Sequence, residues 1–339
     1  MRVAVEGCCH GELDPIYRAL AERERRDGKK ADVLIICGDF QAIRNVADFE
    51  SMAVPEKYRK LNTFYKYYKG EARAPVLTLV IGGNHEASNY MHELFYGGWL
   101  APNIYYLGAA GVVRLGGLRI AGMSGIFKEH NYERGHFERP PYNKGSVRSV
   151  YHIRKAEVFK LLQLQQPLDI FLSHDWPRGV ANCGFCDRNS LLRKKPFFKK
   201  EVNTDTLGNP AAALLLQRLR PKRWFSAHLH TRFDATVYHG FQKNDRTVAM
   251  CLPVGVKPNM APNATSTQFL ALDKCLPRRE FLEVLDVAPS ASTSGSAAEP
   301  EGPPQLEYDP EWLAILRTYH HLMSHSRDRV ALPGNGEQR

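Results

Sequence analysis

Five short apolar runs lie in the first 230 residues of the chain, and each is directly followed by residues that can bind a metal ion. The runs are Arg2–Val5, Asp32–Ile36, Val76–Ile81, Ile170–Leu172 and Trp224–Ala227. Each is brief, apolar and bounded by turn or polar residues, which is typical of a buried β-strand. Because helical patterns separate the runs, we predict a layered α/β domain with some antiparallel pairing.

Further elements are expected between and after these strands. Aromatic and apolar side chains recur at helical spacing over Pro55–Tyr68, so a helix is predicted there. Helices are also predicted over Arg148–Leu164 and Pro210–Leu219. Two adjacent glycines separate Val112–Leu115 from Leu118–Ala121, and both glycines tolerate a positive φ, so these runs are predicted to form a hairpin.

The polar residues that follow the five strands form one candidate set of ligands. In open α/β sheets the loops at the carboxyl ends of the strands converge, so residues far apart in sequence can meet there. Imidazole, carboxylate and amide groups together suit Zn, Mn or Fe. Any one of these residues alone is better explained as a hydrogen-bonded or turn residue. Five such segments in order favour a metal site, and they are Cys8-Cys9-His10, Gly38-Asp39, Gly82-Gly83-Asn84-His85-Glu86, Ser173-His174-Asp175 and His228-Leu229-His230.

The composition limits the partners and the compartment. The chain has 46 Lys and Arg against 36 Asp and Glu, and the net charge of +10 favours anionic partners such as nucleic acid. The apolar runs are too short to cross a bilayer, and the N-terminus lacks the apolar region of a signal peptide, so no membrane partner is expected. Seven scattered cysteines, an odd number, favour a reducing compartment such as the cytosol or nucleus.

Residues 124–148 form a long connection in which aromatic and basic side chains alternate. Aromatic rings can stack on unpaired bases while cations pair with phosphates, so an RNA contact is predicted here. The alternative is a surface loop packed by its own side chains. A second basic run, Arg188–Lys200, is either an RNA guide or import signal, or a solvated basic loop. The candidate RNA-binding residues of the first segment are Phe127, Lys128, Tyr132, Arg134, Phe137, Arg139 and Tyr142.

The last part of the chain differs in composition. Residues 288–304 have no large apolar side chain and are predicted to be a flexible linker. Beyond it, an apolar stripe predicts a helix that starts near Pro310, and docking of this helix on the core is favoured over binding of a partner. We therefore divide the chain into a catalytic domain (1–255), a segment that ends the core or starts the C-terminal region (256–287), the linker, and a C-terminal helix and tail (305–339).

The order of the candidate ligands resembles the signature of the calcineurin-like metallophosphoesterases, D-x-H, G-D, G-N-H-E, H and G-H-x-H. The resemblance implies an α/β sandwich of mixed β-sheets flanked by helices, here with a C-terminal extension. It implies that Asp39 bridges two metals and that His85 contacts the phosphate or the leaving group. The remaining metal ligands that it implies are His10, Asn84, His174, His228 and His230.

Two positions depart from this signature. Cys8 stands in place of the opening acid, and Ala227 in place of a glycine. The second change is small, but the first replaces a hard carboxylate with a soft, weakly acidic thiol. Either Cys8 binds a thiophilic metal as a thiolate, or that metal position binds weakly and one ion does most of the work.

Longer strings narrow the resemblance. The opening M-R-V-A-V-E-G-C-C-H-G-E-L-D, with I-G-G-N-H-E-A-S-N, Y-G-G-W-L-A-P-N-I-Y-Y-L-G and W-F-S-A-H-L-H, is similar to the family of RNA lariat debranching enzymes over residues 1 to about 275. The resemblance implies hydrolysis of the 2′–5′ phosphodiester in excised intron lariats, and one or two Fe2+, Zn2+ or Mn2+ ions. It also implies branched RNA as partner, a lariat-recognition insertion at 124–148, and a nuclear location with or without shuttling to the cytoplasm.

Two alternatives stay open at this point. Another calcineurin-like phosphoesterase, such as a protein phosphatase or a nuclease, would keep the opening acid that Cys8 replaces. A scaffold that keeps the fold but has lost catalysis would show decay among the ligand positions, and only the position of Cys8 departs. For the debranching reaction, His85 is the expected general acid, since a placed imidazole can protonate a leaving oxygen.

Overall fold

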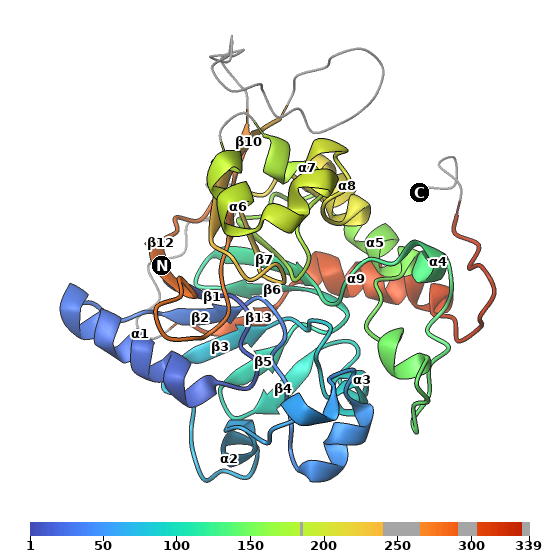
Figure 1. Ribbon diagram of the computed structural model, residues 1–339. Coiled ribbons are helices and arrows are strands. Elements are labelled where there is room, and N and C mark those ends of the chain that lie inside the picture. Colours follow the sequence, from blue (N-terminus) through green and yellow to red (C-terminus); the bar gives the residue numbers. More distant parts are fainter. Residues whose placement is uncertain (184–185, 240–264, 291–303, 334–339) are drawn as a thin grey trace.

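Two β-sheets packed face to face form the centre of the molecule, and helices cover both outer faces (Figure 1). The computed structural model describes residues 1–183, 186–239, 265–290 and 304–333 of the chain. Within these ranges the architecture confirms the predicted fold class, a sandwich of mixed sheets flanked by helices.

The first sheet has a parallel centre and antiparallel edges. Strands β1, β2, β3 and β5 run parallel, and β12 and β4 pair with the two ends of this set in the antiparallel sense. In spatial order the strands are β12 (Leu282–Asp286), β1 (Arg2–Glu6), β2 (Val33–Ile36), β3 (Leu77–Val80), β5 (Ile104–Tyr106) and β4 (Gly98–Ala101).

The second sheet is built in the same way. Strands β7, β8, β9 and β11 are parallel, and β10, β6 and β13 are antiparallel to their neighbours. In spatial order the strands are β10 (Phe233–Tyr238), β11 (Ser266–Ala271), β9 (Arg223–Ser226), β8 (Ile170–Ser173), β7 (Leu118–Met123), β6 (Ala110–Leu115) and β13 (Leu306–Tyr308).

The strand predictions are confirmed. The five predicted strands correspond to β1, β2, β3, β8 and β9, and the predicted hairpin is formed by β6 and β7. The described part of 256–287 supplies β11 to the second sheet and β12 to the first, so this segment lies inside the sandwich. The division of the chain into domains stays a prediction.

The core follows from the alternation of side chains along each strand. Val3 and Val5 of β1 point between the sheets and pack with residues of the second sheet such as Ile170 and Leu172. Ala4 points the other way, into a second cluster beneath α1 (Leu13–Asp27). A third cluster lies between the second sheet and the helices that cover it.

The helices begin and end for identifiable reasons. The predicted helix at 210–219 is confirmed as α8 (Pro210–Leu219). The side chain of Asn209 accepts hydrogen bonds from two first-turn N–H groups, and Pro210 has no N–H that would need an acceptor. The other α-helices are α2 (Phe64–Tyr68), α3 (Ser88–Glu93), α4 (Glu129–Tyr132), α5 (Lys155–Leu162), α6 (Arg188–Lys194), α7 (Lys199–Asn203) and α9 (Pro310–Tyr319). Short 3-10 helices are η1 (Val46–Ser51), η2 (Glu56–Tyr58), η3 (Ser146–Arg148), η4 (Val180–Asn182), η5 (Pro196–Phe198) and η6 (His320–Leu322).

The predicted helix over Pro55–Tyr68 is wrong. Only η2 and α2 form, and Asn62 between them has a φ of 50° and donates its side-chain amide to the carbonyl of His10 at 2.7 Å. The helix predicted over Arg148–Leu164 is confirmed only from residue 155 onward, as α5. Arg154 before it is extended, because its buried guanidinium reaches the carboxylate of Glu138 at 2.6 Å.

The C-terminal helix docks on the core, as expected. Trp312 and Ile315 of α9 are buried in the cluster on the second sheet. The side chain of Asp309 caps the helix by accepting the backbone N–H of Trp312 at 2.9 Å, and it also pairs with Arg119. Of the predicted linker, residues 291–303 lie outside the described residues.

Candidate metal centre

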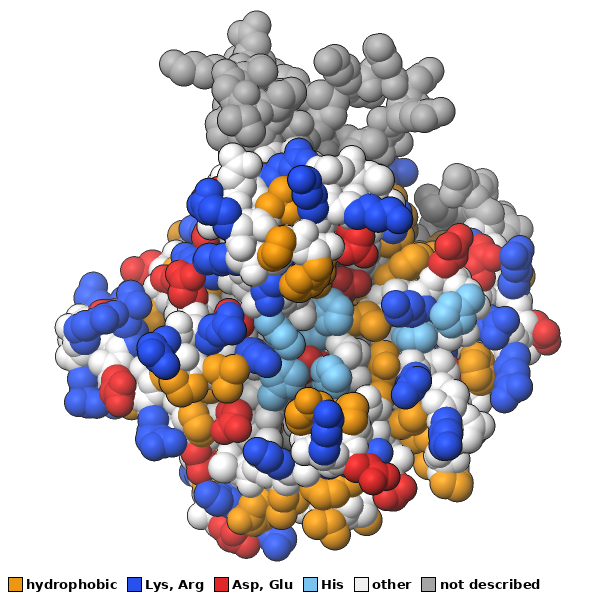
Figure 2. All heavy atoms as spheres, in the orientation of Figure 1, with side chains coloured by type: hydrophobic (Ala, Val, Ile, Leu, Met, Phe, Trp, Pro, Cys, Tyr) orange, Lys and Arg blue, Asp and Glu red, His pale blue; other side chains and the backbone are white. Residues whose placement is uncertain are grey.

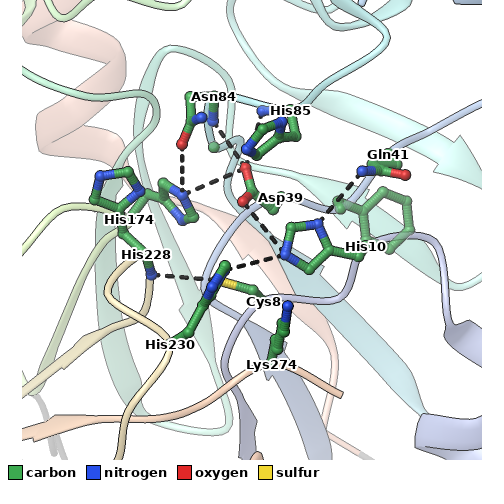
Figure 3. Close-up of polar contacts among 12 residues, drawn as sticks. Cys8, His10, Asp39, Gln41, Asn84, His85, His174, His228, His230 and Lys274 are labelled. Atoms are coloured by element: carbon green, nitrogen blue, oxygen red, sulfur yellow. Dashed lines mark hydrogen bonds and ion pairs between the residues drawn. The ribbon is translucent and has the colours of Figure 1, made fainter. Parts of the chain in front are cut away.

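The parallel strands of both sheets end at the same edge, and the predicted ligands gather there. Cys8 and His10 follow β1, Asp39 follows β2, and Asn84 follows β3, all from the first sheet. The second sheet supplies His174 after β8 and His228 and His230 after β9. Figure 3 shows these side chains arranged around Asp39, and Figure 2 shows histidines gathered at the centre of that face of the molecule.

The carboxylate of Asp39 lies between two groups of donor atoms. The side chain is 1% exposed, its Oδ1 lies 3.3 Å from Nε2 of His174, and its Oδ2 lies 3.7 Å from Nε2 of His10. Oδ1 also accepts the backbone N–H groups of Asn84 and His85, each at 2.9 Å. Oδ2 is buried and accepts no hydrogen bond from the described residues, so it is free to bind a cation.

The first group of donors consists of Cys8, His10, Asp39 and His230. One ligand atom from each lies within 4.8 Å of all the others. Nε2 of His10 is 3.2 Å from Nε2 of His230, and Sγ of Cys8 accepts the backbone N–H of His228 at 3.2 Å. Sulfur, imidazole and carboxylate in one cluster fit a borderline divalent cation.

The second group lies on the other side of the same carboxylate. Nε2 of His174 is 3.3 Å from the amide oxygen of Asn84, and the ring of His174 is 4.9 Å from that of His228. Nδ1 of His174 is directed to the carbonyl of Cys37 at 2.8 Å, which leaves Nε2 facing Asp39. The structure therefore brings together all seven residues predicted as ligands, around one shared carboxylate.

Burial and neighbouring charges shape the protonation of this centre. Burial lowers the pKa of His228 and of His230 to about 3, with smaller effects from neighbouring imidazoles, so both rings keep a free lone pair. Burial works against the charged form of Asp39 too, but the charge and hydrogen bond of His174 hold its pKa well below the usual range. Burial, with the charge of Asp39, raises the pKa of the Cys8 thiol.

The backbone of this centre is strained. His10, Asp39, His228 and His230 have φ values of 47°, 46°, 61° and 49°, in the left-handed region that non-glycine residues rarely adopt. Such strain clusters at functional sites, where the surrounding structure holds it. Gly38 has a φ of 103°, and a Cβ atom there would lie 2.4 Å from Nδ1 of His174.

Glu86 was not among the predicted site residues, although it fixes two of the site loops. Its buried carboxylate accepts the backbone N–H groups of Phe40 and Gln41, each at 2.8 Å, and that of Gly83 at 2.7 Å. The loop that carries Asp39 is thereby tied to the loop that carries Asn84 and His85. The signal was present in the G-N-H-E string, whose last residue received no role.

Lys274 is a second residue that sequence reasoning missed. It follows β11, and its segment is joined to the loop of Cys8, whose backbone N–H donates to the carbonyl of Asp273 at 3.4 Å. Figure 3 shows the Lys274 side chain beside His10 and His230. The same pattern that pointed to the other ligands, a strand followed by polar residues, is present at Ser266–Ala271.

His85 lies on the side of Asp39 away from Cys8 (Figure 3). Its backbone N–H is held by Asp39, its ring is 5.6 Å from that of His10, and its side chain is partly exposed. The imidazole is thus at the rim of the centre, where a bound molecule can reach it.

The aromatic residues of the predicted insertion at 124–148 are largely packed internally. Phe127 and Tyr132 contact each other with ring centroids 5.1 Å apart and pack against the core. The Phe137 ring centroid lies 5.4 Å from the guanidinium carbon of Arg154 and 5.1 Å from that of Arg327. The Tyr142 hydroxyl donates to the carbonyl of Ser88 at 3.5 Å.

The basic residues of the insertion face outward. Lys128, Arg134 and Arg139 are exposed. The segment around Gly135 pairs with a C-terminal segment around Ser326. The backbone N–H of Gly135 donates to the carbonyl of Ser326 at 3.1 Å, and neighbouring residues of the two segments are also hydrogen-bonded. Whether these residues contact RNA stays a prediction.

Two family models match the chain. One is described as calcineurin-like phosphoesterase and matches residues 1–232, and the other is described as lariat debranching enzyme, C-terminal domain, and matches residues 264–339. Among the described residues, no helix is both long and apolar enough to cross a membrane.

Curated proteins named lariat debranching enzyme are similar to nearly the whole chain. The one from Danio rerio is 56% identical over 95% of this chain and 52% of its own length. The one from Homo sapiens is 55% identical over 96% of this chain and 55% of its own length. The one from Arabidopsis thaliana is 50% identical over 96% of this chain and 70% of its own length. The chain thus spans about half the length of the two animal relatives.

Proposed function

The chain belongs to the lariat debranching enzyme family of the calcineurin-like phosphoesterases, and we propose that it hydrolyses the 2′–5′ phosphodiester at the branch point of excised intron lariat RNA. The observation that carries this proposal is the position of Asp39, a buried carboxylate with one oxygen toward each of two donor groups. Membership of the family implies that the chain binds divalent metal.

The donor set fits such a cation. The buried Oδ2 of Asp39 has no hydrogen-bond donor among the described residues, and the low pKa values of His228 and His230 keep their lone pairs free. We propose that Cys8, His10, Asp39 and His230 hold one ion and that Asp39, Asn84, His174 and His228 can hold a second. Fe2+, Zn2+ and Mn2+ all suit these ligands, and the thiol of Cys8 favours the more thiophilic of them.

The metal supplies two things when bound: water with a lowered pKa, and positive charge against the phosphate oxygens. The protein residues then have separate tasks. His85, at the rim, carries the proton for the departing 2′ oxygen of the branch nucleotide. Lys274 adds a positive charge beside His10 and His230, where it can attract the phosphate.

Bond by bond, one water adds its oxygen to phosphorus, and the bond from phosphorus to the 2′ oxygen breaks. The proton from His85 goes to that oxygen, and the proton lost by the water restores the acid. The products are a 2′-hydroxyl on the branch nucleotide and a 5′-phosphate on the released strand.

The insertion supports branched RNA as the substrate. Lys128, Arg134 and Arg139 are exposed cations on a segment that precedes α5, and exposed cations of this kind pair with phosphates. We assign 124–148 as the lariat-recognition insertion of a catalytic domain at 1–255, followed by 256–287, the linker at 288–304 and the C-terminal helix and tail. A substrate made by splicing implies a nuclear location for the chain, and shuttling to the cytoplasm would be tested by imaging the tagged chain.

A gel assay of the metal-loaded chain on branched and linear RNA tests the proposal. Cleavage of the 2′–5′ linkage with the 3′–5′ linkages left intact is the expected result. Hydrolysis of phosphoserine peptides instead would favour a protein phosphatase, and cleavage of linear RNA would favour a nuclease. No hydrolysis of any of these substrates, with metal bound, would favour a scaffold that has lost catalysis.

A further inference from the structure

A groove of about 370 Å3 lies beside the metal centre, outside the insertion. It is called the basic groove here and is lined by Lys194, Lys195, Phe197, Thr231, Arg278 and Arg279, with two acidic residues among them. Its residues come from three parts of the chain. These are α6 with η5, Thr231 directly after His230, and the turn that follows β11.

The basic groove is built on the same loops as the metal centre. Thr231 directly follows His230, whose Nε2 belongs to the first donor group. Asp273, also on the groove, accepts the backbone N–H of Cys8 at 3.4 Å through its carbonyl. A polymer that is bound at the metal centre and extends past His230 and the loop of Cys8 therefore passes over the basic groove.

The basic groove carries an excess of positive charge. Nζ of Lys194 is 3.2 Å from a carboxylate oxygen of Glu280, and Nη1 of Arg279 is 3.2 Å from one of Asp273, so each acid is already matched to a cation. In the parts of the chain that the structure describes, Lys195 and Arg278 have no carboxylate within 4.0 Å. These two remaining cations attract an anion.

An exposed aromatic ring completes the pattern. Phe197 is 68% exposed, although its neighbour Phe198 packs against the core and holds it edge to face with ring centroids 4.5 Å apart. Nζ of Lys195 lies 6.0 Å from the Phe197 ring centroid. An anchored ring with one face open, next to unmatched cations, is the arrangement that binds single-stranded nucleic acid by stacking and phosphate pairing.

We propose that the basic groove binds one single-stranded arm of the branched RNA, with Phe197 stacked on a base and Lys195 and Arg278 paired with phosphates. This proposal rests on the proposed function, because the branch must be held at the metal centre. A branch nucleotide joins three strands, so at least one arm must cross the surface next to the scissile bond. The basic groove is separate from the insertion and gives such an arm a path of its own.

The test compares two substrates of the metal-loaded chain: a branched RNA with arms of about ten nucleotides, within the usual site size for such surfaces, and a branched trinucleotide too short to leave the centre. Phe197→Ala is expected to raise KM for the long-armed RNA between about fivefold and about 150-fold, the range for one lost stacking contact. Lys195→Ala is expected to raise it about fivefold at 0.1 M salt and to reduce the slope of log KM against log salt by about 0.7. Neither change should alter kcat, or KM for the trinucleotide.

Matched controls lie away from the basic groove. Tyr308→Ala removes an aromatic ring that is also 68% exposed, and Lys30→Ala removes a lysine at the amino end of β2, opposite to the metal centre. Both should leave KM unchanged for both substrates. Thermal unfolding of each variant should match that of the parent chain, because Lys30, Phe197 and Tyr308 are exposed and Lys195 is partly exposed.

Three results would overturn the proposal. The first is an unchanged KM for the long-armed RNA, and the second is an equal rise for the trinucleotide, which would mean that the changes disturb the metal centre. The third is loss of nuclear accumulation of a tagged chain with RNA affinity intact, which would make this segment an import signal. If the chain cleaves neither substrate, the proposed function fails. Fluorescence anisotropy with a linear ten-nucleotide RNA then tests RNA binding by the basic groove alone. Weaker binding by Phe197→Ala than by the parent chain supports the groove, and equal binding refutes it.

Discussion

Asp309 holds the C-terminal helix to the second sheet through a buried ion pair. Its Oδ2 lies 2.8 Å from Nε of Arg119 and its Oδ1 lies 2.8 Å from Nη2, and both side chains are fully buried. The same carboxylate caps α9 and also reaches Arg114. Replacing Asp309 therefore removes two hydrogen bonds from a buried guanidinium, which keeps the Glu311 carboxylate and the Gln166 carbonyl, each at 2.6 Å.

The cost can be worked out in two ways. Removing one partner of a buried ion pair typically costs about 3–5 kcal/mol, so Asp309→Ala is expected to lower the free energy of unfolding by that amount. The pairing with Arg119 and Arg114 outweighs the effect of burial and lowers the Asp309 pKa from 3.8 to about 2. At 1.36 kcal/mol per pH unit this corresponds to about 2 kcal/mol from the charge itself. Asp309→Asn keeps the shape and a capping oxygen, so it should cost about 2 kcal/mol.

Urea unfolding followed by circular dichroism at constant metal concentration measures these differences. Because the folded-state pKa of Asp309 is depressed, its contribution is present above about pH 4 and is lost as the pH falls towards 2. The stability of the parent chain and of Asp309→Asn should therefore differ at pH 7 and converge in acid. Glu307→Gln, an exposed change on β13, should cost less than about 0.5 kcal/mol. Equal costs for the Ala and Asn variants, or a gap that persists at pH 2, would refute the reasoning.

Three more predictions concern the metal centre. His85→Ala should reduce kcat on branched RNA by about a hundredfold to ten-thousandfold with little loss of bound metal, and equal loss of both, measured by elemental analysis, would contradict its role as acid. Cys8→Ser should abolish the thiolate-to-metal absorption of the cobalt-loaded chain, and a band that survives would mean that the thiol is not a ligand. Gly38→Ala should displace His174 and lower both metal content and activity, since the new Cβ would lie 2.4 Å from Nδ1, whereas Gly28→Ala, at a φ of 67° with open space around it, should leave both unchanged.

The strands and the positions of the proposed ligands were predictable because their signals are local. Ile170–Leu172 is a short apolar run bounded by polar residues, which is the pattern of a buried strand, and the proposed ligands follow the ends of such strands. The helix expected over Pro55–Tyr68 failed because a distant contact decides that region. The side-chain amide of Asn62 donates a hydrogen bond to the carbonyl of His10. The buried rings of this region are Phe64 and Tyr67, whereas Tyr58 is exposed.

The parts of the site that escaped prediction depend on long-range pairing. Lys274 reaches the centre only because its segment lies beside the loop of Cys8, more than 260 positions earlier in the chain. Glu86 accepts two backbone N–H groups from the loop of Asp39, at least 45 positions earlier, and one from Gly83 of its own loop. The pattern of aromatics among cations left two readings open for Phe127 and Tyr132, stacking on bases or internal packing, and the two rings contact each other in the structure.

The two sheets contribute separate halves of the proposed ligand set. Cys8, His10, Asp39 and Asn84 belong to one sheet, and the remaining three imidazoles belong to the other. These residues would hold a cation with ligands from both sheets, and such an ion would cross-link the two layers as a disulfide can. Removing it with a chelator should loosen the sheets from each other at this edge, and at a hundredfold excess of metal over Kd the native state gains about 2.7 kcal/mol. Hydrogen exchange at this edge would therefore report how strongly the ion holds the fold together.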